Sequence, residues 1–411
     1  MICFFYVTKS VKITNKEHTL VFEGTQDKDQ VPLDKIYFST PSDFYNQVNN
    51  LKKKTGEEVM FAVDSKMVSS LDGFPEHIGF GNLDQLEKFK GKSEVKIAIV
   101  NAMSNSIGDH LIGMQAFDYW HRKICELLSG TKVTVSLFQL NPYQLSDITR
   151  QWSDKIDHLY LLPNNVTKLI EQDAFVDLGT MLLREGFDTE PMIDFFLKAL
   201  SVDPNSVLDK NKRIKYTVGD ETATQIQEVM REVKSHLRPV LLFHHKSTTP
   251  IREIEDCRVK KIIEEIISKS EYFVISATSL SDQQDIDSNR FMDVSQYCPS
   301  LDHFAAIISQ VDGIVTVDTC TYHLADAFSI PTIVLFSSID PDLRIKYYPY
   351  VQAIMYESKD GRLFGKHKAS TDEDELKKEL EYLSTLWDKI NVDEILEKLQ
   401  NLTKMKEEVV L

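Results

Sequence analysis

Residues 311–341, which read VDGIVTVDTCTYHLADAFSIPTIVLFSSIDP, constrain the fold of this chain more than any other stretch. The pattern predicts a buried strand over 313–317, a turn at Asp318-Thr319, a helix from about Thr321 and a second apolar strand over 332–336. A strand end that leads into a helix N-terminus presents free backbone N–H groups and the positive end of the helix dipole. Such a turn is suited to holding a phosphate or a diphosphate.

The same letters also fit an ordinary strand–helix turn, in which Thr319 or Thr321 caps the helix and no ligand binds. His323 falls in the first turn of the predicted helix, where its ring would add a donor to a bound anion. The spacing alone leaves both interpretations open.

Composition narrows the class of protein. The 411 residues are too many for one compact core, and 42% apolar with 27% charged residues is ordinary for a globular protein of two or three domains. No apolar run is long enough for a transmembrane helix, and the N-terminal letters MICFFYVTKS predict a first strand rather than a signal peptide. A net charge of −16 argues against a nucleic-acid partner. Five scattered cysteines without paired spacing predict reduced thiols in the cytoplasm.

The pattern of apolar and polar residues along the chain predicts four regions. Residues 1–93 carry short β-like runs and predict a small, mostly β domain, ending in a charged linker over 83–93. From 94 the pattern alternates between strands and helices, which predicts two Rossmann-like domains, 94–235 and 236–371, that face each other across a cleft. The last part, 372–411, predicts a charged, solvated helical tail. The expected fold class is therefore α/β.

A second motif stands where the first alternating series begins. An apolar strand over 95–100 is followed by NAMSNSIGDH and a helix from about Leu111. Gly108 is expected to permit a tight turn, and Asp109 to lie at or near the helix N-cap, with its carboxylate at the C-terminal edge of the sheet. Because aspartate is a favoured N-cap in any protein, a purely structural role fits equally.

Taken together, the two motifs resemble glycosyltransferase family 9, the ADP-heptose heptosyltransferases. The matching letters are Ser106-Ile107-Gly108-Asp109 in the first motif, and Val317-Asp318-Thr319, His323-Leu324-Ala325, Ala327, Pro331-Thr332, Leu335-Phe336 and Asp340-Pro341 in the second. Two departures stand out, because Cys320 replaces the usual glycine and Ser337-Ser338 replaces a Gly-Pro-like pair. A side chain at Cys320 would narrow the approach of the backbone to a diphosphate.

The resemblance implies a GT-B fold of two Rossmann-like domains, with the sugar-nucleotide donor bound mainly by the second, and inverting transfer. Asp109 would be the general base that takes the proton of the acceptor hydroxyl. The leaving diphosphate would be held by the residues of the second motif, namely Asp318, Thr319, Cys320, Thr321 and His323.

The loop after Phe243, HHKSTTPIRE, resembles the polar family loop that follows the first strand of the second domain. Its candidate donor-binding residues are Lys246, Thr248, Thr249 and Arg252, and the lysine and the arginine compete for one role. A solvated loop with ordinary charges is the alternative.

We expect no metal and no cofactor other than the donor, an ADP-sugar by resemblance. Asp285-Ile286-Asp287 has the letters of a metal-binding DxD pair but lies in a polar loop, so we interpret it as surface. His244 and His245 are neighbours on a strand, where adjacent side chains point to opposite faces and do not share a metal.

The β-rich N-terminal region resembles an arrangement in bacterial autotransporter heptosyltransferases, which modify protein serines in the cytoplasm. Their cysteine-based iron site has no counterpart here, because no cysteine follows Cys320. The acidic charge favours a protein acceptor over an anionic lipopolysaccharide core. Alternatives from other classes are a catalytically silent GT-B scaffold that partners another transferase, and a sugar-nucleotide epimerase. The oligomeric state stays open.

Overall fold

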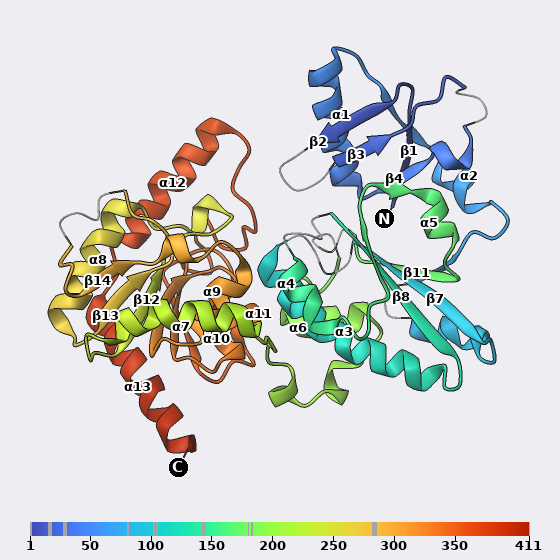
Figure 1. The fold of residues 1–411 in the computed structure, drawn as a ribbon. Coiled ribbons are helices and arrows are strands. Elements are labelled where there is room, and N and C mark those ends of the chain that lie inside the picture. The colour runs from blue at the N-terminus through green and yellow to red at the C-terminus, as the bar shows by residue number, and fades with distance from the viewer. Residues whose placement is uncertain are drawn as a thin grey trace. The chain divides into compact units, whose positions relative to one another are not determined.

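The structure, a computed structural model, describes residues 2–14, 19–27, 31–79, 82–101, 103, 106–140, 145–179, 181, 184–281 and 286–410. These divide into two compact units (Figure 1). Unit 1 comprises Met1–Phe187 and Met192–Val207, and unit 2 comprises Asp188–Pro191 and Leu208–Leu411.

The N-terminal part of unit 1 is built on a four-stranded antiparallel sheet in the order β10-β4-β1-β5, beside a two-stranded hairpin. Its elements are β1 (Cys3–Val7), β2 (Val11–Thr14), β3 (Thr19–Phe22), η1 (Leu33–Lys35), β4 (Tyr37–Ser39), α1 (Pro41–Thr55), β5 (Met60–Val63), α2 (Ser65–Ser69) and β10 (Asn164–Asn165). The β-rich character predicted for this region is present as strands, but the sequence analysis did not identify α1. That helix is capped by the Thr40 side chain and buries Phe44 and Leu51 on the side that faces the sheet.

The rest of unit 1 is a parallel five-stranded sheet in the order β6-β11-β7-β8-β9. Its elements are β6 (Glu76–Ile78), η2 (Leu83–Phe89), β7 (Glu94–Val100), α3 (Ile107–Leu127), β8 (Lys132–Gln139), α4 (Ser146–Thr149), η3 (Arg150–Trp152), β9 (His158–Leu161), α5 (Val166–Ile170), β11 (Ala174–Asp177), α6 (Met192–Ala199) and η5 (Pro204–Ser206). After β7 the chain continues through β8 to β9 on one side, and β11 then returns to the other side of β7. The order of the sheet therefore reverses between β7 and β11.

The two sheets of unit 1 share one hydrophobic core. Phe38 of β4 contacts Phe138 of β8, with ring centroids 5.2 Å apart, and Leu162 and Val166 lie in the same cluster. The linker expected over 83–93 instead contains η2, which buries Leu83, Leu86 and Phe89. The sequence boundary at 93 therefore falls inside a continuous unit.

Unit 2 is a parallel six-stranded sheet in the order β14-β13-β12-β15-β16-β17. Numbered along this unit, the order is 3-2-1-4-5-6, that of the dinucleotide-binding Rossmann sheet. Its elements are η6 (Asp209–Asn211), α7 (Asp220–Lys234), β12 (Val240–His244), η7 (Pro250–Arg252), α8 (Asp256–Lys269), β13 (Phe273–Ser276), β14 (Phe291–Asp293), η8 (Ser295–Tyr297), α9 (Leu301–Ile308), β15 (Gly313–Val317), α10 (Thr321–Ala327), β16 (Thr332–Phe336), α11 (Asp342–Ile345), β17 (Val351–Met355), α12 (Glu373–Trp387) and α13 (Val392–Val410).

The central strands of unit 2 are apolar on both faces because helices cover both faces of the sheet. Every residue of β15 and β16 is buried, and both strands have the bounds predicted from the sequence. At the start of β15, Leu399 of α13 comes within 3.0 Å of where a Cβ on Gly313 would lie. The missing side chain lets this helix pack closely on the strand.

The C-terminal helices are part of unit 2 rather than a solvated tail. Each has a charged outer face and an apolar inner stripe, and its inner residues lie in the same cluster as the strands of the sheet. The buried members are Leu383, Leu386, Trp387, Val392, Ile395, Leu399 and Leu402. The expectation of a free helical tail is therefore wrong.

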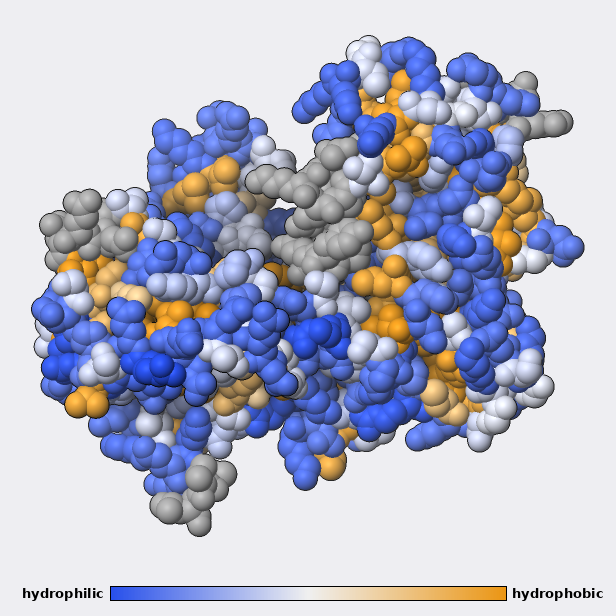
Figure 2. Space-filling model, viewed as in Figure 1, coloured by the Kyte–Doolittle hydropathy of each residue, from blue (hydrophilic) through white to orange (hydrophobic). Residues whose placement is uncertain are grey.

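Hydrophilic side chains cover most of the face shown in Figure 2, with smaller hydrophobic areas between them. Within the described ranges, no helix is both long and apolar enough to cross a membrane. All five cysteines lie in those ranges, and each is a free thiol.

Candidate functional site

The C-terminal ends of β12 and β15 mark the point where the strand order of unit 2 reverses. These strands are neighbours, and His244 at the end of β12 pairs in register with Thr316 of β15. Open α/β sheets bind ligands in the crevice outside such a point. Both sequence segments that resemble the donor site, the loop after Phe243 and the turn after Val317, begin at this edge.

The turn between β15 and α10 is held by its aspartate. Asp318 is 3% exposed, and its Oδ1 accepts a hydrogen bond of 2.9 Å from the Tyr322 hydroxyl. Its Oδ2 lies 3.1 Å from Nη1 of Arg252, and its backbone carbonyl accepts a 3.1 Å bond from the Ser247 hydroxyl. Burial, with the charge of Asp318, raises the pKa of Tyr322 well above its ordinary value, so this hydroxyl keeps its proton as a donor.

Cys320 fits the turn without strain. It is the N-cap of α10 with φ −60° and ψ −17°, a conformation open to any residue, so the backbone does not need the glycine of the family pattern. Thr319 precedes it and is half-buried, and Thr321 is fully buried as the first residue of the helix. Burial raises the pKa of the Cys320 thiol to about 11, so the thiol is uncharged at neutral pH.

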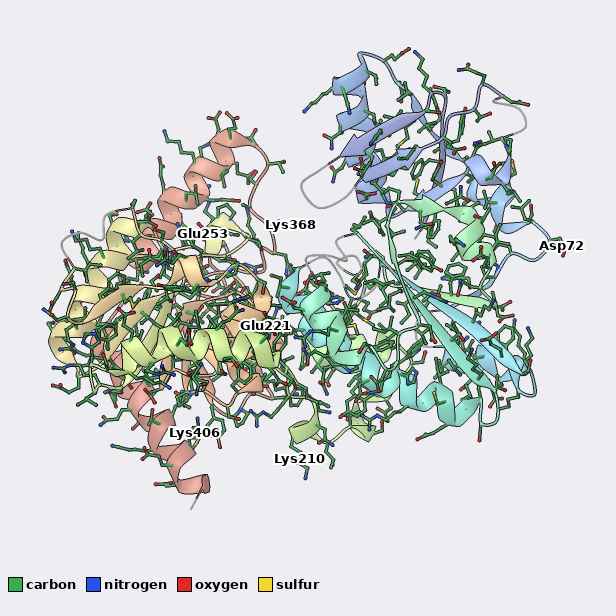
Figure 3. All side chains as sticks on the ribbon, viewed as in Figure 1. Asp72, Lys210, Glu221, Glu253, Lys368 and Lys406 are labelled. Carbon is green, nitrogen blue, oxygen red and sulfur yellow. The ribbon has the colours of Figure 1, made fainter. Side chains whose placement is uncertain are left out.

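The two cations that competed for one role have different partners. Arg252 pairs with Asp318, and its Nη2 donates to the backbone carbonyl of His367 at 2.9 Å. Lys246 instead lies 3.0 Å from Oδ1 of Asp256 and 3.7 Å from Glu253, which Figure 3 labels. Arg252 is therefore joined to the β15–α10 turn, whereas Lys246 is engaged with acidic residues next to η7 and α8.

The rest of this loop is ordered through Ser247, which the sequence analysis did not single out. Its hydroxyl oxygen accepts from the backbone N–H of Thr249 at 3.4 Å. Thr249 is half-buried and is the N-cap residue before η7, and Thr248 is exposed. Ser337, the first residue of the departing Ser-Ser pair, donates a 2.8 Å hydrogen bond to the carbonyl of Ile251 in η7. Ser337 thus holds the segment that carries Arg252.

His323 lies in the first turn of α10, as predicted, but its ring is 3% exposed. A hydrogen bond of 2.8 Å joins its Nδ1 to the Tyr348 hydroxyl. Burial lowers its pKa to about 3 despite the charge of Asp318, so the ring is neutral. The ring is thus a buried part of α10 that joins this helix to Tyr348.

His244 and His245 have separate partners, as the alternation of a strand predicts. The ring of His244 is hydrogen-bonded through Nδ1 to Oγ1 of Thr321 at 2.9 Å. His245 is fully buried between Thr278 and Asp256, each 3.2 Å from one of its ring nitrogens. The sequence analysis considered His244 only as a metal ligand and missed its position beside the turn. The sequence did offer one indication of this position, because His244 stands at the end of the first predicted strand of the domain, where ligands bind in such sheets.

In unit 1, the motif before α3 differs from the expectation. The helix begins at Ile107, and its N-cap is Ser106, whose Oγ accepts from the backbone N–H of Asp109 at 3.2 Å. Asp109 is thus a half-buried residue of the first turn rather than the cap. Gly108 lies within the helix and is not among the described glycines with positive φ, so it forms no tight turn.

The loop before α3 is closely packed where it is described. A Cβ on Gly113 would lie 2.6 Å from the side chain of Met103, which is fully buried against the helix. At the neighbouring strand end, Asp177 of β11 pairs in register with Val100 of β7. This buried carboxylate stands where the strand order of unit 1 reverses, and the sequence analysis did not identify it.

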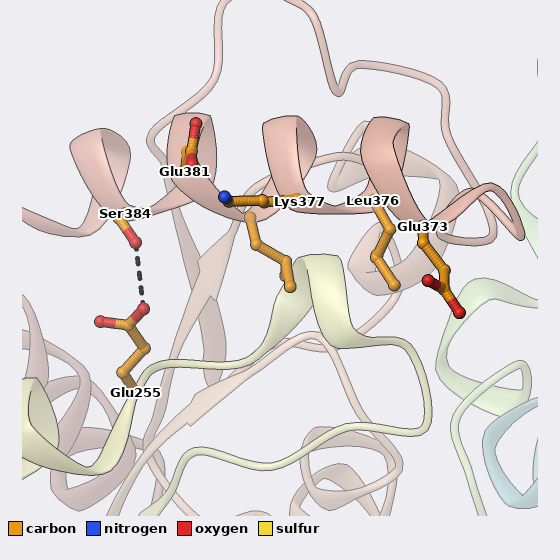
Figure 4. Close-up of a pocket in the computed structure, with 7 residues that line it drawn as sticks. Glu255, Glu373, Leu376, Lys377, Glu381 and Ser384 are labelled. Carbon is orange, nitrogen blue, oxygen red and sulfur yellow. Dashed lines mark hydrogen bonds between the residues drawn. The ribbon is translucent and has the colours of Figure 1, made fainter.

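The DxD letters fall partly outside the described residues, which exclude Asp285. Among the residues that are described, no group of three or more His, Cys, Asp or Glu side chains could hold a metal ion. A small pocket of about 340 Å³ lies between α12 and Glu255, which accepts a hydrogen bond from Ser384 (Figure 4). None of the site residues named above lines it.

A comparison with protein families finds a match over the segment that contains the β15–α10 turn. Residues 290–371 match the family described as glycosyltransferase family 9 (heptosyltransferase), a range that includes β15, α10 and β16. A search of curated proteins by sequence finds no significant match.

Among solved structures, the E. coli ADP-heptose LPS heptosyltransferase II matches with a TM-score of 0.52 and 13% identity, over 76% of this chain and 99% of that one. A family 9 glycosyltransferase from Veillonella parvula DSM 2008 matches with a TM-score of 0.51 and 12% identity, over 76% and 98%. At these identities the likeness shows the fold, which is GT-B.

Residues 290–371 are therefore similar to glycosyltransferase family 9, and the chain has the GT-B fold of the two solved structures.

Proposed function

We propose that this enzyme transfers a heptose-like sugar from an ADP-sugar to a hydroxyl of a protein acceptor, with inversion at the anomeric carbon. One observation carries the proposal. The segment that matches family 9 supplies the β15–α10 turn, and this turn lies at the strand-order reversal of a Rossmann sheet.

On the donor side, Arg252 is the cation that we assign to the diphosphate. Its guanidinium is fixed by Asp318 and by the His367 carbonyl, so little side-chain entropy remains to be lost when an anion binds. The backbone N–H groups around Thr319–Thr321 add donors, and together these groups stabilise the charge that grows on the leaving diphosphate.

On the acceptor side, we assign the role of general base to Asp109 by its match to the family motif. The acceptor hydroxyl must lose its proton as it attacks the anomeric carbon, and a carboxylate accepts that proton. Asp109 follows β7, the strand next to the reversal point of the unit 1 sheet, and it is held in the first turn of α3.

A protein acceptor and a cytoplasmic location complete the proposal. The net charge of −16 opposes an anionic, surface-bound lipopolysaccharide core, and free cysteines fit a reducing compartment. No separate observation favours the silent scaffold or the epimerase.

A thermal-shift panel of ADP-, GDP-, UDP- and CMP-sugars tests the donor class. A ligand at about 100 times its dissociation constant stabilises a protein by about 2.7 kcal/mol, so the matching donor is expected to raise the melting temperature by several degrees. ADP-heptose should give the largest shift. If no sugar nucleotide shifts the melting temperature, the proposed function is wrong.

A further inference from the structure

His244 lies at the reversal point of the strand order in unit 2. The sequence analysis did not count it among the residues that bind the sugar nucleotide. It ends β12, opposite Thr316 of β15, and it is half-buried. Two neighbours fix its ring. Phe304 of α9 packs against it with ring centroids 5.2 Å apart, and Thr321 bonds its Nδ1 at 2.9 Å.

The bond to Thr321 determines which nitrogen carries the proton. The Thr321 side chain is fully buried, and His244 is the partner of its hydroxyl among the described residues. If Nδ1–H donated, the hydroxyl proton would be left buried without an acceptor, which costs free energy. The hydroxyl therefore donates to Nδ1.

The neutral imidazole then has its proton on Nε2. Burial, together with the neighbouring His245, lowers the pKa of His244 to about 3, so the ring stays neutral at physiological pH. Within the described part of the chain, Nε2 has no hydrogen-bond partner, and it is not among the enclosed polar atoms. A fixed N–H donor is thus open at the strand edge where the phosphates of nucleotides bind in such sheets.

We infer that His244 binds the donor nucleotide, donating a hydrogen bond from Nε2 to an oxygen of its diphosphate, and that Thr321 sets the tautomer. This inference rests on the proposed function for the identity of the ligand. The tautomer, in contrast, is a property of the protein without ligand.

The first test is calorimetric titration of the full chain with ADP, GDP and UDP. His244→Phe keeps a ring against Phe304 but removes the donor, and we expect it to weaken binding of the preferred diphosphate about 10- to 100-fold. His244→Gln keeps an amide N–H that reaches toward the same place and should recover most of the affinity. The matched control is His236→Phe, because His236 is exposed and precedes β12 at the opposite edge of the same sheet.

The second test is nitrogen NMR of the histidine rings without nucleotide, which distinguishes the two neutral tautomers. We expect the Nε2–H form for His244 at pH 7, and a mixture of forms in Thr321→Val. Melting temperatures without ligand confirm that the variants fold.

The outcomes separate the two claims. If the wild type binds a nucleoside diphosphate and His244→Phe binds it equally well, the inference is wrong while the proposed function stands. An Nδ1–H tautomer or a charged ring in the wild type also overturns it. If the wild type binds none of the three diphosphates, the proposed function fails, and the inference fails with it.

Discussion

At the scale of single residues, the proposed donor site depends on a buried carboxylate that has a partner at each of its two oxygens. Asp318 accepts from Tyr322 at one oxygen and faces Arg252 at the other. A buried charge without partners is costly, so these neighbours keep the turn in one conformation. The tyrosine belongs to α10 and the arginine to η7, and the carboxylate therefore joins two segments that are distant in sequence.

Arg252 and Lys246 should have unequal effects on donor affinity. We expect Arg252→Gln to weaken ADP binding about 10- to 100-fold, because it removes a charged donor next to the turn. Lys246→Gln should change it less than about threefold, since this lysine is engaged by Asp256 and Glu253. Titration calorimetry at one salt concentration measures both. The reverse order of effects would transfer the diphosphate role to Lys246.

Buried neutral histidines should make unit 2 sensitive to acid. Burial lowers the pKa of His245 to about 4 and of His323 to about 3, whereas an unfolded histidine has a pKa of about 6.5. Above about pH 6.5 both states are neutral and the pair adds no pH dependence. Below it the unfolded state binds more protons, so each histidine lowers the free energy of unfolding by about 1.4 kcal/mol per pH unit until pH nears the folded pKa.

Urea unfolding at pH 7.0 and 5.5 measures this loss. His323→Asn should reduce the pH dependence by about one proton even though it lowers stability at pH 7. His158→Asn, at an exposed position of β9, serves as the control and should leave the dependence unchanged. Equal pH dependence in wild type and His323→Asn would show that His323 titrates normally in the folded state.

At the scale of elements, the C-terminal helices complete the hydrophobic core of the unit that carries the proposed donor site. α13 packs on β15 and β16, and Trp387 at the end of α12 donates a 2.7 Å hydrogen bond to the carbonyl of Glu253, the residue after η7. The helices therefore support both the strand before the turn and the segment that carries Arg252.

Leu399→Ala should lower the free energy of unfolding by about 2–5 kcal/mol, because the leucine is fully buried against the start of β15 and its removal leaves a cavity. Met405→Ala, on the exposed side of the same helix, should change it by less than about 1 kcal/mol. Denaturant unfolding monitored by fluorescence compares the two. Similar small losses would mean that α13 is not part of the cooperative core.

The elements that the sequence predicted well are those with uniform burial. β15 and β16 are apolar throughout, so their bounds could be read directly from the letters. α3 begins earlier than predicted because a serine, and not the aspartate three residues later, caps it. α1 was missed, although Phe44, Val48 and Leu51 have helical spacing, because the flanking residues are mostly polar.

The candidate site, too, could be predicted from the sequence only in part. The letters placed Asp318 and Thr319 in the turn and Thr321 at the start of the helix, and the structure has them there. They did not reveal the contacts of Arg252, His244 and Tyr322, because these depend on which strands are neighbours in the sheet. These contacts are determined by the neighbouring positions of β12 and β15 in the sheet, which a local sequence pattern does not show.

At the scale of the whole molecule, each of the two units has its own part in the proposed reaction. Unit 2 has the Rossmann strand order and the family 9 match, and we assign it the donor. Unit 1 combines an N-terminal antiparallel sheet and a parallel sheet around one core, and we assign it the general base Asp109. An intact N-terminal sheet is therefore expected to be needed for unit 1 to fold.

The most direct measurement of the central claim compares donor turnover and donor affinity in the wild type and Asp109→Asn. The assay follows ADP release from ADP-heptose with candidate acceptor proteins, and calorimetry gives the dissociation constant of ADP. We predict that the variant loses at least about 100-fold in turnover, the typical effect of removing a general base, with ADP affinity within about threefold of wild type. Wild-type turnover in Asp109→Asn, or a wild type that neither binds ADP nor consumes ADP-heptose, would contradict the account.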